Sequence, residues 1–145
     1  MRLKTVLAGL FVLAFATASF AQGPRCSLGT LKGSYGGNLV GNQPFTNAAG
    51  VVVLEQVVGV VVREYDGGGG FTQVANVKGS LSGWTPDRRG NGTYTINEDC
   101  SGTITFSNPA FMIQERIVIV DNAREIRAAT MQPPGLFVTS TAKRI

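Results

Sequence analysis

The carboxylate of Glu115 is the side chain of this sequence best placed to do chemistry. The almost continuously apolar segment Phe111–Asp121 predicts a strand, in which alternate side chains share one face, and Glu115 lies in the middle of an otherwise apolar stripe. A buried acid facing a cavity can protonate or orient a ligand. The alternative interpretation, which we favour, has two forms. Either the strand register places this face outward, or Glu115 forms a structural ion pair with an arginine of a neighbouring strand, with Arg63 and Arg127 as the possible partners.

Other catalytic groups are scarce. The chain contains no histidine, which excludes a Ser-His-Asp relay, an imidazole base and a His-ligated metal. The glycine run Asp66–Gly70 lacks the Lys-Ser/Thr pair of a phosphate-binding loop and leads into a predicted strand, so it indicates a hairpin turn. The sequence therefore predicts no catalytic residue, no metal and no cofactor, and it favours a binding or structural role over an enzyme.

The two cysteines, Cys26 and Cys100, predict one disulfide bond. Two cysteines in an exported chain most often pair with each other, and these two lie far from the Cys-x-x-Cys spacing of a redox or metal site. We expect the bond to pin the start of the mature chain to a hairpin turn.

The N-terminus has the pattern of a cleaved export signal. Arg2 and Lys4 precede an apolar run over Val6–Ala16, and Ser19-Phe20-Ala21 supplies the small residues of a cleavage site. The apolar run is shorter than the ~20 residues that cross a bilayer, and no later stretch replaces it. We expect residues 1–21 to be a signal peptide, residues 22–145 to form one domain, and the product to be periplasmic or extracellular without a membrane span.

The charge of the chain does not indicate nucleic acid as a partner. Its formal net charge of +4 falls to +2 once Arg2 and Lys4 leave with the signal peptide. The remaining basic residues are scattered along the chain, whereas a nucleic-acid site gathers them on one face with aromatic residues between them.

A hairpin over Gly92–Phe106 is the clearest structural signal. Alternating Thr and apolar residues flank the polar turn Asn97–Gly102. Pro86–Gly92 is predicted to be a loop, and no segment shows a helical period with caps. About eight short strands joined by tight turns predict an all-β protein, a single antiparallel up-and-down β-barrel, with a β-sandwich as the alternative. The remaining strands are expected at Ser34–Val40, Val51–Tyr65, Phe71–Val77 with a continuation at Gly79–Trp84, Phe111–Val120, Glu125–Met131 and Leu136–Thr141.

The segment Val51–Tyr65 is unusually long and carries valines on both faces. Gly59 is expected to mark a bulge or a sharp bend within it. Glu55 and Glu64 are an odd number of residues apart, so they fall on opposite faces. An outer apolar patch near Val57–Val62 either packs under another part of the chain or forms a homo-oligomer contact.

Three aromatic residues, Trp84, Tyr94 and Phe106, are candidates to line a ligand cavity together with Glu115. Aromatic residues in a small β domain are more often part of the core. An eight-stranded barrel either fills its interior with side chains or holds one small ligand, and both outcomes stay open at this point.

Four blocks resemble the recurrent motifs of a group of small, largely uncharacterised exported bacterial proteins. They cover Cys26–Tyr35, Asp66–Thr72, Gly92–Thr103 and Ile119–Ile126. The resemblance implies a barrel like those of lipocalins or allene oxide cyclases, with the two cysteines paired. It carries no known catalytic residues.

Three functions are compatible with these observations. The first is non-catalytic binding of an apolar or amphipathic small molecule inside the barrel. The second is a structural or self-associating module of the envelope or extracellular space. The third, a cyclase or isomerase that works by shaping a cavity, rests on analogy of fold alone.

Overall fold

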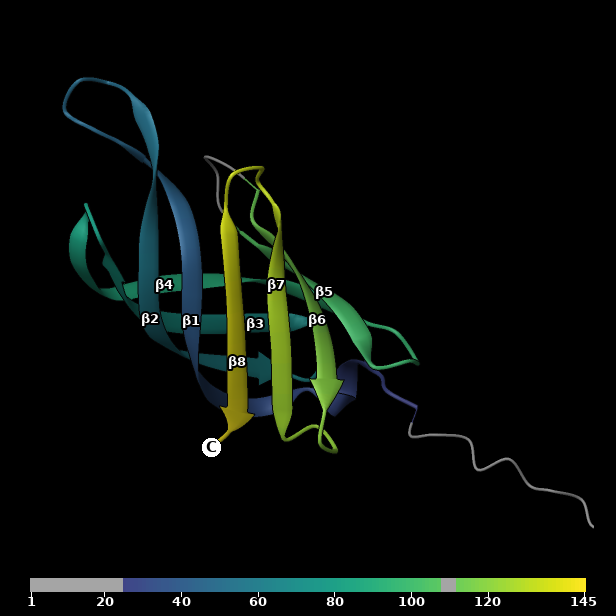
Figure 1. The fold of residues 1–145 in the computed structure, drawn as a ribbon. Coiled ribbons are helices and arrows are strands. Elements are labelled where there is room, and N and C mark those ends of the chain that lie inside the picture. The colour runs from purple at the N-terminus through teal and green to yellow at the C-terminus, as the bar shows by residue number, and fades with distance from the viewer. Residues whose placement is uncertain (1–24, 108–111) are drawn as a thin grey trace, which may run out of the picture.

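Eight antiparallel strands follow one another around a closed barrel in the order β1 to β8 (Figure 1). The structure, a computed structural model, describes residues 25–107 and 112–145, so the predicted signal peptide lies outside the described residues. A short 3-10 turn, η1 (Leu28–Thr30), precedes the barrel. Each strand pairs with the next, and β8 closes the barrel against β1. The strands are β1 (Lys32–Thr46), β2 (Val52–Asp66), β3 (Gly70–Gly79), β4 (Gly83–Ile96), β5 (Ser101–Phe106), β6 (Gln114–Val120), β7 (Glu125–Gln132) and β8 (Phe137–Arg144).

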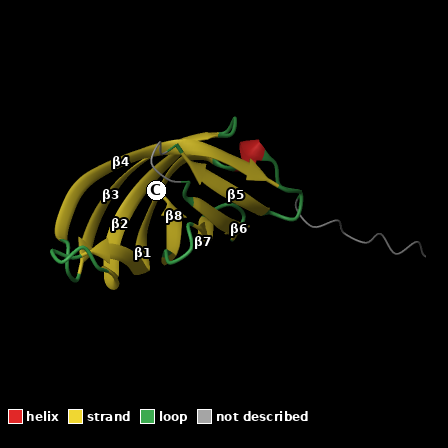
Figure 2. Cartoon of the chain, turned by 90° about the horizontal axis from the view of Figure 1, so that it is seen from above, coloured by secondary structure: helices red, strands yellow, loops and turns green. Residues whose placement is uncertain are grey.

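The prediction of an all-β, up-and-down barrel is confirmed. Alternation of buried and exposed positions along β2 shows why the chain folds this way: Val57 and Val61 face the interior, while Val58 and Val60 between them face outward. Seen from above, the strands form one curved wall (Figure 2). The predicted hairpin over Gly92–Phe106 is formed by β4 and β5.

The barrel interior contains two apolar clusters. The larger one gathers three tyrosine rings, Tyr35, Tyr65 and Tyr94, which pack edge to face at centroid distances of 5.6 and 5.2 Å. Leu31, just after η1, is fully buried in this cluster and plugs that end. The smaller cluster consists of Val57, Val61, Ala75 and Val77 on β2 and β3.

The predicted disulfide bond between Cys26 and Cys100 is present. It ties the segment before η1 to the turn between β4 and β5, where the N–H of Cys26 also donates to the carbonyl of Glu98 at 3.2 Å. The bond therefore holds the segment Cys26–Leu31, which we call the plug, at the end of the barrel that Leu31 fills.

Three sequence predictions of local structure are wrong. Gly79–Trp84, expected to continue the strand of Phe71–Val77, contains the turn between β3 and β4. The expected loop over Pro86–Gly92 lies inside β4, because Arg88 to Gly92 pair with β3. Gly59 is not a bulge, since the β1–β2 and β2–β3 registers continue through it. Glycine is needed there because a Cβ would come within 2.6 Å of the carbonyl oxygen of Asn76. The register shifts occur instead near Ala75 in β3 and near Glu115 in β6.

The β1–β2 hairpin extends beyond the rest of the wall. Pairing of β1 with β2 continues to Thr46 and Val52, whereas β8 reaches only Asn42 and β3 reaches only Val57 (Figure 1). Among the described residues, no helix is long and apolar enough to cross a membrane.

Candidate functional site

A cavity of about 200 Å³ lies beside the smaller apolar cluster. Its walls are aliphatic side chains from four strands, and Thr130 of β7 joins the carbonyl of Val138 of β8 through a 3.1 Å hydrogen bond at one side. The apolar residues of the lining are Leu39, Val57, Ala75, Val77, Phe106, Ile113, Leu136 and Val138. Polar and charged residues complete the lining, namely Gln43, Gln73, Arg88, Arg89, Asn91, Ser107, Glu115 and Thr130.

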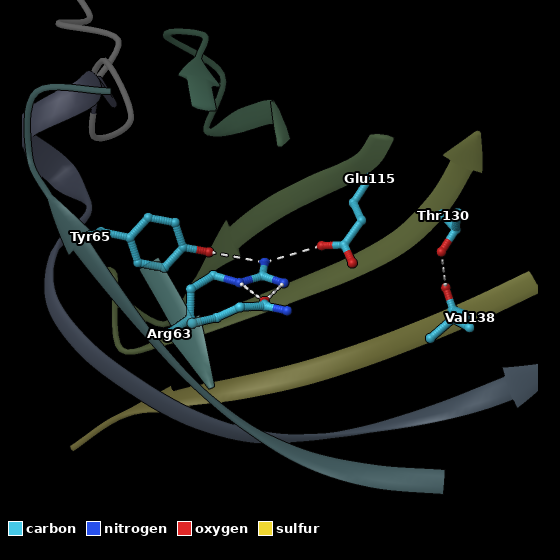
Figure 3. A network of polar contacts seen from close by, with 6 residues as sticks. Arg63, Tyr65, Glu115, Thr130 and Val138 are labelled. Carbon is cyan, nitrogen blue, oxygen red and sulfur yellow. Dashed lines mark hydrogen bonds and ion pairs between the residues drawn. The ribbon is translucent and has the colours of Figure 1, made fainter. Parts of the chain in front are cut away.

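Arg63 occupies the barrel interior behind this cavity. Its Nη1 donates to Glu115 Oε2 at 3.0 Å and to the Tyr65 hydroxyl at 3.3 Å (Figure 3). Its Nε and Nη2 both donate to Gln73 Oε1, at 3.0 and 2.8 Å. The guanidinium also lies 5.1 and 5.3 Å from the ring centroids of Phe71 and Phe106. This one cation therefore binds three polar groups and two aromatic faces.

The surroundings keep Arg63 charged. Burial opposes the charged guanidinium, but the Glu115 carboxylate and the Tyr65 oxygen outweigh it, so the pKa of Arg63 lies above its ordinary value. Burial raises the pKa of the Tyr65 phenol, so this group stays protonated at neutral pH. The cluster is consequently a neutral ion pair held by neutral hydrogen-bonding partners.

Glu115 joins this cluster to the cavity. Its side chain is 12 % exposed, and among the described residues only Arg63 forms a hydrogen bond with it, through Oε2. The favoured interpretation of Glu115 as a structural ion-pair partner is confirmed, and the partner is Arg63. Arg127, the other candidate, bonds to Glu125 on the surface at 2.7 Å. Glu115 is also part of the cavity lining.

The four candidate ligand residues do not converge on one site. Glu115 and Phe106 line the cavity. Tyr94 belongs to the core at the plugged end, where its hydroxyl lies within hydrogen-bond distance of the carbonyls of Leu28 and Leu31. Trp84 is 60 % exposed and pairs with Lys78 on the outer face. A strand pattern does not specify which end or face of a barrel an aromatic side chain reaches. The sequence alone therefore does not separate Trp84, Tyr94 and Phe106.

Sequence reasoning missed a second buried charge, Glu55. This carboxylate is 1 % exposed and accepts hydrogen bonds from the Gln43 side chain, the N–H groups of Leu81 and Ser82, and the Ser82 hydroxyl, at 2.7 to 2.9 Å. The Gln43 bond is the largest cause that lowers the pKa of Glu55 to about 2. The sequence of β2 does indicate this burial, because alternation places Glu55 and Arg63 on the same face as Val57 and Val61. The predicted placement of Glu55 and Glu64 on opposite faces is confirmed.

The side chains that line the cavity offer apolar surface and hydrogen-bonding groups to a ligand. Among the described residues there is no unpaired thiol and no group of three or more metal-ligating side chains. Its one carboxylate is paired with Arg63. No known protein family, curated protein or solved structure matches the chain.

Proposed function

We propose that this protein binds one small apolar or amphipathic molecule, without catalysis, in the barrel cavity. The observation that carries the proposal is the cavity itself, a space with apolar side chains from several strands and polar or charged residues around them. Ligand sites of proteins typically combine apolar walls with a small number of placed polar groups. A cyclase or isomerase would need an acid that exchanges a proton with its substrate, and the ion pair of Glu115 with Arg63 opposes that use.

The volume limits the ligand. The cavity of about 200 Å³ is smaller than the ~300–1,000 Å³ common for drug-sized ligands, yet an apolar cavity of ~150 Å³ is enough for benzene. The cargo is therefore a single ring or a short alkyl chain with one polar end. The disulfide bond, the signal-like N-terminus and the resemblance to small exported barrels support action in the periplasm or outside the cell.

A larger side chain inside the cavity should weaken ligand binding. We expect Val138→Trp to weaken the binding of octan-1-ol at least ~10-fold, because the indole occupies the space of the ligand. Isothermal titration calorimetry of the purified, oxidised protein measures the change. The matched control is Phe137→Trp, which introduces the same ring at the adjacent, 63 % exposed position of β8 and should leave the affinity unchanged. Equal effects of the two substitutions, or wild-type protein that binds no octan-1-ol, would contradict the proposal.

A second candidate function is self-association through the outer face of β2. Val58, Val60 and Val62 are 53, 58 and 48 % exposed, and Val40 of β1 lies opposite Val58. A row of exposed aliphatic residues on a sheet is typical of a protein contact. A second copy of this chain fits the row because the valines carry no charge that would repel an identical surface.

This candidate predicts a dimer that a charge disrupts. Val60→Lys places an ammonium group in the middle of the row, so it should shift the protein to monomer in sedimentation velocity runs, lowering the dimer affinity at least ~10-fold. Thr95→Lys, at an exposed position of β4 away from the row, is the control and should leave the distribution unchanged. A wild-type protein that stays monomeric at all concentrations tested would remove this candidate.

A further inference from the structure

Two arginines of β4, Arg88 and Arg89, form part of the cavity lining. Arg88 lies opposite buried Ala75, so it is on the interior face of the wall, and its exposed side chain ends at the mouth. Within the described part of the chain, no hydrogen bond or ion pair involves either guanidinium. Arg89 follows Arg88 on the strand and lies opposite Val74, so its side chain is on the outer face. Among the described residues, the mouth therefore carries one unpaired positive charge, that of Arg88, beside an apolar space.

The carboxylates near the cavity do not neutralise this charge. Glu115 is paired with Arg63, and Glu55 is saturated by hydrogen bonds from Gln43 and the β3–β4 turn. Asp87 precedes Arg88 on the exposed strand but is not part of the lining. The cavity lining thus carries a positive charge at Arg88, whereas Glu115 contributes a carboxylate that is paired with Arg63.

We propose that the ligand is a small anionic amphiphile, a carboxylate whose apolar body fills the cavity and whose head group binds Arg88. This proposal rests on the proposed binding function. The opposite orientation would bring the head group against Glu115, where two carboxylates repel each other. With the head group at the mouth, the Arg88 guanidinium supplies charge-assisted hydrogen bonds, and the alkyl or ring portion contacts Val57, Val77 and Val138.

A matched pair of probes tests the charge. Octanoate and octan-1-ol have the same chain length and differ in the head group. We expect Arg88→Gln to weaken octanoate ~10-fold and octan-1-ol less than ~2-fold in calorimetric titrations, since only octanoate uses the guanidinium group. Arg88 is exposed, so the variant should fold normally. The control is Lys78→Gln, on the outer face of β3, which should leave both affinities unchanged.

The outcomes separate this inference from the binding function. If both probes bind and Arg88→Gln leaves the octanoate affinity unchanged, the anionic ligand is overturned and the cavity function stands. Equal losses for both probes would also overturn it, because a general disturbance of the mouth then explains the effect. Binding of neither probe by the wild-type protein would overturn both proposals. Weakening of octanoate alone by added salt would support the ionic contact.

Discussion

The variant Arg63→Met should lower the free energy of unfolding by about 3–5 kcal/mol. The substitution removes the partner of Glu115, which is then left largely buried without a counter-charge, and it removes the donor to Gln73 and Tyr65. Urea unfolding followed by circular dichroism measures the change. Arg127→Met is the control, because the side chain of Arg127 is 68 % exposed and its surface ion pair is worth less than ~1 kcal/mol.

The double variant Arg63→Met/Glu115→Gln identifies the cause of that loss. Removing both charges leaves no unpaired ion in the barrel, so the double variant should recover ~1–3 kcal/mol relative to Arg63→Met alone. Strictly additive effects of the two single substitutions would show that the pair is not coupled. That result would contradict our account of Arg63 as the counter-ion of Glu115.

Loss of the disulfide bond has the second large effect that we expect. Cys26 and Cys100 are 74 positions apart, and opening a loop of this length should destabilise the protein by about 4 kcal/mol. The comparison is between oxidised protein and the variant Cys26→Ser/Cys100→Ser in urea unfolding. Because the bond holds the segment that carries Leu31, the tryptic sites after Arg25 and Lys32 should also become more accessible in the variant. A loss below ~1 kcal/mol would contradict the role of the bond in holding the plug.

Much of this fold could be predicted from local patterns. Alternation in Gly92–Phe106 and the valine-rich run of Val51–Tyr65 indicated strands, turn residues separated them, and the two cysteines indicated their own pairing. The loop predicted over Pro86–Gly92 was wrong because proline, glycine and two arginines have little strand propensity by themselves. Pairing with β3 overrides that local preference.

The candidate site was less accessible to sequence reasoning. Arg63 and Glu115 are 52 positions apart on β2 and β6, and they meet only because the barrel closes. Arg63 could be named as one of two partners, but the choice over Arg127 needed the strand order. The cavity depends on side-chain volumes from several strands, so no single segment indicates whether the interior is filled or open.

The central claim is that the barrel carries a small molecule, and native mass spectrometry of the purified, oxidised protein tests it most directly. We expect the wild-type protein to retain a small molecule that it bound in its host and to release this molecule on mild activation. Val138→Trp should be isolated without it. Phe137→Trp should retain the same molecule. The claim would be contradicted by wild-type protein that is free of any ligand. Its mass spectrum would then match that of Val138→Trp apart from the substitution.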